Sequence, residues 1–379
     1  MDSRQKSIFW KAGGVALVIW SVLTIASIFA ELWIGSRALV VSYQGKLYFP
    51  VIQGQISGRI FGMDYDYEAD YRELQKVIDA RVHGAETTEN APRKLQTEGT
   101  YTPETVLYMP AKTAEPACAH DFVILPLVPY NITENALATY APDKFAPSPP
   151  NFEHRNFLGT DPLGRDILAR LVYGYRNALI FAGLYLVGLM VIGTVLGLMF
   201  GYYGGAFDFW GQRIIEIWSN IPFIYVVMIV ASITAPNLVW LVVLSLIFGW
   251  TGVAAFVRAL VFREKTREFV LAAKATGASD WRIIVGHLLP QMGTMLLTFL
   301  PFQAVGAITT LTSLDFLGFG LRPPAASWGE LLRTGSSSLQ APWIVSSVVV
   351  AMALVLILLT IIGNALREAF DPKTLLRYK

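Results

Sequence analysis

The sequence has 379 residues, of which 54% are hydrophobic and only 15% are charged. Soluble domains carry about 25% charged residues, so this composition excludes an ordinary soluble domain and indicates a chain that lies largely in lipid. The net charge of +2 gives no electrostatic footprint for nucleic acid. The single cysteine excludes an internal disulfide framework, and the four histidines are too scattered for a metal site, so no metal is expected.

The first apolar run covers residues 12–30 and follows Arg4, Lys6 and Lys11. A cleaved signal peptide would have an apolar core of about 7–15 residues, followed by a cleavage site with small residues. This run is longer, and Ile28 stands where a small residue should precede Ala30. We therefore expect residues 1–30 to form an N-terminal tail and an uncleaved first transmembrane helix.

Residues 31–172 contain no apolar run long enough to cross a bilayer and are rich in proline, tyrosine and acidic residues. Two β-rich stretches on either side of Gln44-Gly45 predict a hairpin with a tight turn, and residues 64–82 predict an amphipathic helix. We expect an extramembrane insertion of mixed structure, with no fold assigned to residues 51–140.

Five further apolar runs can cross the membrane, and with the first run they predict an all-α polytopic protein of about six transmembrane helices. They lie near residues 177–201, 214–235, 238–257, 291–312 and 343–363, within a core from 173 to 379. Small residues recur at four-residue spacing on one helix face, at Gly193, Gly197, Gly201 and Gly205. Internal helix packing is the main interpretation of this face, and a subunit interface is the alternative.

Positive charge is concentrated in three segments, which sets the expected orientation. The N-terminal tail, the loop 258–290 and the C-terminal tail are all basic. Because Lys and Arg accumulate on the cytoplasmic side, six spans place both termini and this loop in the cytoplasm and the insertion outside.

The spans after residue 177 carry almost no ionisable side chains, apart from Glu216, for which Arg213 predicts an i,i+3 ion pair. Ion-coupled transporters usually need carboxylates or histidines inside the bilayer. The sequence also has no G-x-x-x-x-G-K-[ST] phosphate loop and no catalytic triad or paired-carboxylate motif. We expect no enzyme activity and no cofactor in this chain, so a transport pathway would be driven by a partner bound at the cytoplasmic face.

The loop between 258 and 290 has the pattern of a docking element. A short helix from Glu268 to Thr276 should end at Gly277, which suits a left-handed C-cap. A second amphipathic stretch from Trp281 should stop at Pro290. Two short surface helices with small exposed residues can enter a groove of another protein, and an ordinary amphipathic connector is an equally good interpretation of this pattern alone.

The same loop resembles the cytoplasmic EAA loop of ABC importer permeases. Two positions depart from that pattern, because Leu271 replaces the usual Glu and His287 the usual Ile, although a His-x-Leu-Pro ending is similar to that of peptide-type permeases. The resemblance implies a coupling loop that fits a cleft of an ATPase subunit. Its residues are Leu271, Ala272, Ala273, Gly277, His287, Leu289 and Pro290.

Further motifs resemble the second permease of oligopeptide and dipeptide importers. They are Leu158–Gly174, Gly201–Gly205, Phe316–Leu321 and Ser327–Gly329, within a resemblance that covers residues 155–379. Segments such as Pro147–Pro150 are similar to Yej-type peptide and microcin C importers in particular. The resemblance implies a multi-pass subunit of the bacterial inner membrane that forms half of a peptide pathway, with peptide antibiotics such as microcin C among the candidate cargoes.

The implied partners follow from the same resemblance. They are a second homologous permease, two ABC ATPase subunits or one fused ATPase that hydrolyse ATP with Mg²⁺, and a periplasmic peptide-binding protein. Two other classes are alternatives: a stand-alone secondary transporter or channel, and a membrane-anchored sensor whose insertion binds ligand. The uncharged spans argue against a secondary transporter. Neither the transporter nor the sensor explains the combined motifs.

Polar residues near the pathway are candidates for contact with cargo. Gln303 and Thr309 could line it, with interhelical hydrogen bonds as the alternative. Asp315 and Glu330 could meet a peptide amino group at the outer mouth, with solvated or structural charges as the favoured alternative.

Asp161, Arg165 and Asp166 lie just outside the second span. They could contact a binding protein or the cargo, or they could serve local capping, with Thr160 or Asp161 as the N-cap of the following helix and Pro162 in its first turn. We favour capping for Asp161, whereas Arg165 fits either interpretation.

Overall fold

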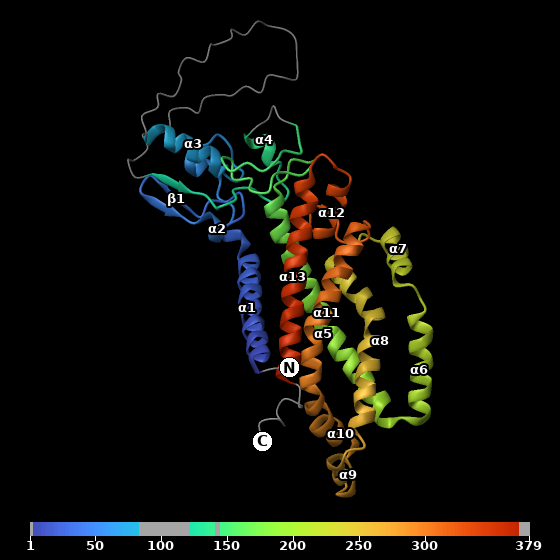
Figure 1. Cartoon of the computed structure of the whole chain (residues 1–379). Helices are drawn as coiled ribbons and strands as arrows, with labels where there is room; N and C mark the ends of the chain where they lie inside the picture. The colour runs from blue at the N-terminus through green and yellow to red at the C-terminus, as the bar shows by residue number, and fades with distance from the viewer. Residues whose placement is uncertain (1–2, 83–120, 141–144, 371–379) are drawn as a thin grey trace.

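The computed structural model describes residues 3–82, 121–140 and 145–370. Within these residues, five helical segments are long and apolar enough to cross a membrane, or six when a bent pair, α6 and α7, counts as one span (Figure 1). The predicted helical core of about six spans is therefore confirmed. The five long helices are α1 (Ser3–Ile28), α5 (Ile167–Tyr203), α8 (Leu238–Glu264), α11 (Leu289–Phe316) and α13 (Pro342–Ala369).

The third predicted span, 214–235, is not one straight helix. It consists of α6 (Gly205–Ser219) and α7 (Phe223–Ile233), which meet at an angle of 64°. Pro222 lies at the break as the N-cap of α7. Proline has no N–H and disfavours helical geometry in the residue before it, so the helix ends there and a new one starts. The predicted ion pair between Arg213 and Glu216 is present at 2.5 Å.

Pro290 does not stop a helix, contrary to the prediction. Instead, α10 (Asp280–Ile283) continues through a π-helical turn, Ile284–Leu288, directly into α11, whose first turn contains the proline. An α-helical proline would collide with the carbonyl four residues earlier, and the wider π turn just before Pro290 gives room for its ring.

A small α/β module precedes α5 and lies at one end of the helical bundle (Figure 1). Its antiparallel sheet has the order β2-β1-β3. The predicted hairpin is confirmed, and Gln44 and Gly45 both have positive φ, as a tight I′-type turn requires. The predicted helix at 64–82 begins only at Tyr71. The module contains β1 (Val40–Tyr43), β2 (Lys46–Tyr48), β3 (Phe122–Ile124), α2 (Pro50–Gln53), α3 (Tyr71–Val82) and α4 (Ala136–Tyr140), with single 3-10 turns at Ala30–Leu32 and Gly58–Phe61.

The amphipathic face of α3 packs under this sheet. Tyr71, Leu74 and Ile78, at helical spacing i, i+3 and i+7, are each 1% exposed and lie in one cluster with Val41 and Val123 of the sheet. The module therefore has a hydrophobic core of its own. Part of the insertion, residues 83–120, lies outside the described residues.

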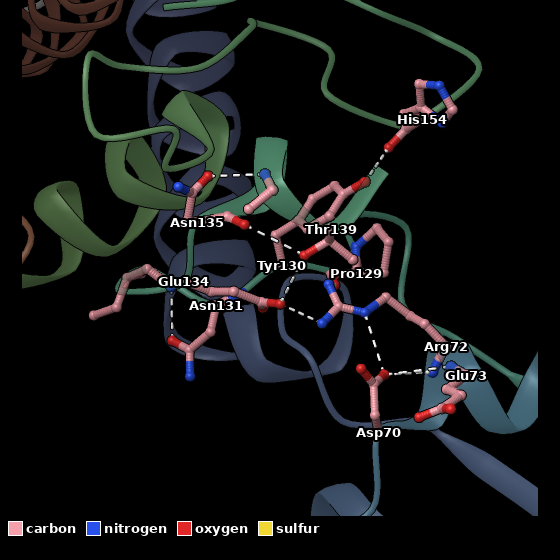
Figure 2. Close-up of polar contacts among 12 residues, drawn as sticks. Asp70, Arg72, Glu73, Pro129, Tyr130, Asn131, Glu134, Asn135, Thr139 and His154 are labelled. Carbon is pink, nitrogen blue, oxygen red and sulfur yellow. Dashed lines mark hydrogen bonds and ion pairs between the residues drawn. The ribbon is translucent and has the colours of Figure 1, made fainter. Parts of the chain in front are cut away.

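Arg72 ties α3 to the segment that leads into α5 (Figure 2). Its guanidinium donates to the Pro129 carbonyl at 3.0 Å, forms an ion pair with Glu134 and lies 5.5 Å from the centre of the Tyr130 ring. The Tyr130 hydroxyl in turn donates to the His154 carbonyl at 2.8 Å. These contacts make α3 and the residues before α5 one unit.

The glycines of α5 pack inside the bundle, against α8. A Cβ at Gly193 would lie 2.6 Å from the Val253 Cβ, and one at Gly197 would lie 2.6 Å from the Ala254 carbonyl oxygen. Gly201 meets α8 in the same way, whereas Gly205 belongs to α6 and has open space around it. Internal packing is therefore confirmed for three of the four glycines.

Candidate functional site

The docking loop, residues 265–288, joins α8 to α11 at the end of the bundle opposite to the module (Figure 1). It contains the predicted pair of short helices, α9 (Glu268–Ala275) and α10, whereas residues 258–264 belong to α8. Gly277 has φ +80°. The N–H of Ala278 donates to the Ala273 carbonyl and the N–H of Gly277 to the Lys274 carbonyl, both at 3.0 Å. This is a Schellman motif, so the predicted left-handed cap at Gly277 is confirmed.

The loop presents an exposed face on which the small residues Ala272 and Gly277 lie near Leu271. Leu271 is 53% exposed, and a Cβ built on Gly277 would meet no atom within 4 Å. Small side chains leave the backbone of a short helix accessible, which is what entry into a groove of another protein requires. Of the loop residues named from the sequence, five are exposed, namely Leu271, Ala272, Gly277, His287 and Pro290, and two are half-buried, namely Ala273 and Leu289.

A buried carboxylate anchors the start of the loop. Glu264, the last residue of α8, is 2% exposed and pairs with Arg263 at 3.1 Å and with Arg267 at 2.7 Å. Arg267 is the N-cap residue of α9. Val270 of α9 and Ile283 of α10 are fully buried in a cluster with α8. The loop is therefore packed onto the bundle and has a defined position.

The opposite end of the bundle carries an outer ion-pair cluster, formed by Asp161, Arg165, Arg170 and Glu330. Glu330 lies in α12 (Trp328–Ser336) and accepts from Arg165 at 2.9 Å and from Arg170 at 2.7 Å. Arg165 also pairs with Asp161 at 2.6 Å.

Arg170 connects this cluster to the module. It is fully buried, and it donates to the Ile132 carbonyl at 3.0 Å in addition to its bond with Glu330. The cluster thus joins the module, α5 and α12. The carboxylate of Glu330 is thus paired with two arginines, and Arg165, 6% exposed, is occupied by internal ion pairs.

The N-cap of α5 is Asp166, and the prediction of Thr160 or Asp161 was wrong. The Asp166 carboxylate accepts from the Ala169 N–H at 2.7 Å and from Asn156 Nδ2 at 2.6 Å. Asp161 instead accepts from the N–H groups of Leu163 and Arg165, which closes a turn before the helix begins. Both aspartates are good helix-start signals, and the sequence does not separate a turn from the cap that follows it.

The four pathway and mouth candidates lie on α11 and α12. Asp315 is buried and accepts from the Leu321 N–H at 2.7 Å and from the Ser327 hydroxyl, so it holds the turn between the two helices. Gln303 is half-buried and Thr309 exposed. The Thr309 hydroxyl donates to the Val305 carbonyl of its own helix at 2.9 Å, which is a local bond and not an interhelical one.

Sequence reasoning missed three residues that organise these two ends: Arg170, Tyr202 and Glu264. Arg170 and Glu264 are charges at the edge of long apolar runs, and a charge in that position is normally paired inside the protein. That signal could have marked them. Tyr202 lies in a recognised motif, but no pattern along the chain indicates what its hydroxyl contacts.

In the part of the chain that the structure describes, five or six helices long and apolar enough to cross a membrane, with a packed loop at one end, define a multi-pass membrane protein. Residues 193–376 match the family described as binding-protein-dependent transport system inner membrane component. The chain is also 36% identical over 362 residues to the inner membrane ABC transporter permease protein YejE of Escherichia coli K12, which covers 96% of this chain and 94% of that protein. The chain belongs to this family of ABC transporter permeases.

Two other relatives carry related names. The peptidoglycan transport system permease protein YejE of Agrobacterium fabrum is 43% identical over 222 residues, 59% of this chain and 58% of that protein. The oligopeptide transport system permease protein OppC of Haemophilus influenzae is 33% identical over 227 residues, 59% of this chain and 72% of that protein. The resemblance predicted from the motifs, including its Yej-type branch, is confirmed.

Proposed function

We propose that the chain forms half of the translocation pathway of an ATP-driven peptide importer in the bacterial inner membrane. The observation that carries this proposal is the docking loop, in which an exposed, capped helix is packed at one end of the bundle. Relatives named as oligopeptide and dipeptide permeases support a peptide as cargo. The Agrobacterium relative, named for peptidoglycan, supports a range that includes peptides of cell-wall origin.

The power for transport comes from partners. The sequence has no phosphate-binding loop, so this chain serves as the transport subunit, and ATP with Mg²⁺ is used by two ABC ATPases or one fused ATPase. A second homologous permease supplies the other half of the pathway. A periplasmic peptide-binding protein delivers cargo at the end that carries the module.

The arrangement of helix ends supports an orientation with both termini in the cytoplasm. α1 begins, and α13 ends, at the end of the bundle that carries the docking loop (Figure 1). That loop and both tails are rich in Lys and Arg, which accumulate on the cytoplasmic side. The module would then lie in the periplasm.

One polar face of α11 is the proposed lining of the pathway. Gln303, Gly306, Thr309 and Ser313 follow each other at three- and four-residue steps, and the last three are exposed. Neutral polar side chains suit a path that passes varied peptides without retaining them. The carboxylates of Asp315 and Glu330 are already bonded, which favours a role in shaping the mouth.

The docking role can be tested by purifying the tagged chain in mild detergent with its bound partners. We expect the wild-type chain to recover a second permease and an ATPase. Gly277→Val should lose the ATPase and keep the permease, because a β-branched residue does not tolerate φ +80° and the cap of α9 would be lost.

Gly277→Asn is the matched control, because asparagine tolerates the left-handed region, and it should retain the ATPase. A wild-type chain recovered alone or as a homo-oligomer, with no ATPase, would contradict the proposal and favour a stand-alone transporter.

A further inference from the structure

The last turn of α5 contacts the docking loop at three points. Lys265, at the start of the loop, donates from Nζ to the Gly201 carbonyl at 2.7 Å. Lys274 of α9 places its ammonium 5.0 Å from the centre of the Tyr202 ring. Asp280, the first residue of α10, accepts a hydrogen bond from the Tyr202 hydroxyl at 2.6 Å.

Each contact has a clear physical cause. The Gly201 carbonyl belongs to the end of α5, where carbonyls lack helical partners and a Lys ammonium is favoured. The face of an aromatic ring attracts a cation. A phenol that donates to a carboxylate forms one of the stronger hydrogen bonds in proteins because the acceptor is charged.

Tyr202 is held in a defined position by the residues around it. Its side chain is 7% exposed and packs in the cluster that contains Val270 of α9 and Ile283 of α10. The helix that carries it is held against α8 by the close approach at Gly193, Gly197 and Gly201. On the loop side of these contacts, Lys274 and Asp280 are exposed.

We propose that Tyr202 is a positioning residue that fixes the docking loop to the end of α5, so that α5 sets where α9 meets its partner. This inference rests on the proposed function of the loop as the ATPase contact. It concerns the hydroxyl of Tyr202 in particular, because that group is the one link between α5 and the start of α10 among the hydrogen bonds of the described residues.

The experiment uses the complete transporter, with its permease partner, ATPase and binding protein, reconstituted in proteoliposomes. The readout is the ratio of ATP hydrolysis with binding protein and peptide to hydrolysis without them. Tyr202→Phe keeps the ring, and with it the contact of Lys274, and removes only the hydroxyl. We expect the ratio to fall about fivefold, because a hydrogen bond to a charged group is lost.

Tyr203→Phe is the matched control and should leave the ratio unchanged. Tyr203 is the next residue in the same turn, its side chain is 55% exposed, and it makes ring contacts with Tyr202 and Phe207. Both variants lose one phenolic oxygen, so a difference between them reports on the bond to Asp280.

Variants of Asp280 distinguish the loss of the Tyr202–Asp280 hydrogen bond from a folding defect caused by the change at Tyr202. Asp280→Asn keeps an acceptor oxygen and should retain most of the stimulation, whereas Asp280→Ala should match Tyr202→Phe. The double variant Tyr202→Phe/Asp280→Ala should be no worse than either single one, because the same bond is removed in all three. Asp280 is exposed, so its variants test the proposal even if Tyr202→Phe fails to reach the membrane.

The outcomes distinguish this inference from the proposed function. A normal ratio in Tyr202→Phe and Asp280→Ala, with a stimulated wild type, would overturn the positioning role and leave the docking function intact. Strictly additive losses in the double variant would also overturn it. A wild-type complex that shows no stimulation at all would instead contradict the proposed function.

Discussion

Arg170 illustrates how a single side chain can join parts of the molecule that are far apart in sequence. It is fully buried, and its partners are Glu330 of α12 and the Ile132 carbonyl next to the module. A charge in such a place costs desolvation energy and is stable only while its partners are present. Arg170 is therefore one of the groups that hold this end of the protein together, beside the ion pair of Arg165 with Glu330.

Replacing Arg170 with methionine should lower the free energy of unfolding by about 3–5 kcal/mol, because Glu330, in a largely buried site, then loses one of its two arginine partners among the described residues. The measurement is the thermal denaturation of the purified chain in detergent. Arg176→Met is the control, since Arg176 is partly exposed and lies 3.4 Å from an exposed Glu31. It should cost less than about 1 kcal/mol. Equal losses in the two variants would contradict the role given to Arg170.

Asp166 should make stability depend on pH. Burial raises the pKa of this carboxyl from 3.8 to about 6, against the hydrogen bonds from Ala169 and Asn156 that lower it. The folded chain then retains a proton that the unfolded chain releases between pH 4 and about 6. Because the folded state binds more protons in that window, the contribution of Asp166 to stability falls as the pH rises through it.

Asp166→Asn should remove this dependence while keeping the cap. Asparagine is as good an N-cap as aspartate. Its amide could donate to Oδ1 of Asn156, which is buried and has no hydrogen-bond partner among the described residues. Melting temperatures of the variant minus those of the wild type should rise between pH 4 and about 6 and then level off. Parallel curves across that window would argue against a raised pKa.

Among the helices, the pairing of α5 with α8 depends on the absence of side chains. The glycines at 193, 197 and 201 let the two backbones approach until a Cβ at Gly197 would lie 2.7 Å from the Val257 Cβ. Dispersion contacts over such a seam replace the hydrophobic driving force that lipid does not supply.

Gly197→Ala and Gly183→Ala should therefore have opposite effects, although both lie in α5. Alanine favours helix over glycine by about 1 kcal/mol, and a Cβ at Gly183 meets no atom within 4 Å, so that variant should be neutral or more stable. At Gly197 the helices must separate, at a cost of about 1–3 kcal/mol. Thermal denaturation of both variants is the measurement, and a stabilised Gly197→Ala would show that the seam can relax.

For the molecule as a whole, the sequence predicted what depends on local pattern. Apolar runs predicted the spans, Gln44-Gly45 predicted the hairpin, and Gly277 predicted the cap of α9, because each depends on neighbouring residues only. The family was predicted from motifs in order along the chain, and the relatives confirm it.

Features that depend on distant residues were not predictable in this way. The strand β3 joins β1 from about eighty residues away, and Glu330 meets Arg165 across 165 positions. The break at Pro222 and the continuous helix through Pro290 show a second limit. The same residue type ends one helix and is accommodated in another, and the difference lies in the π turn that precedes Pro290.

The length of α5 has a mechanical consequence. Its 37 residues correspond to about 55 Å of helix, well beyond the ~30 Å of a hydrocarbon core. One continuous helix therefore extends from the ion pairs of Arg170 to the phenol of Tyr202. If α5 tilts as a unit by about 5°, one end shifts by about 5 Å relative to the other. A protein that docks at one surface of the membrane and displaces that end of α5 would therefore also displace the other end. No series of side-chain rearrangements between the two ends would be needed.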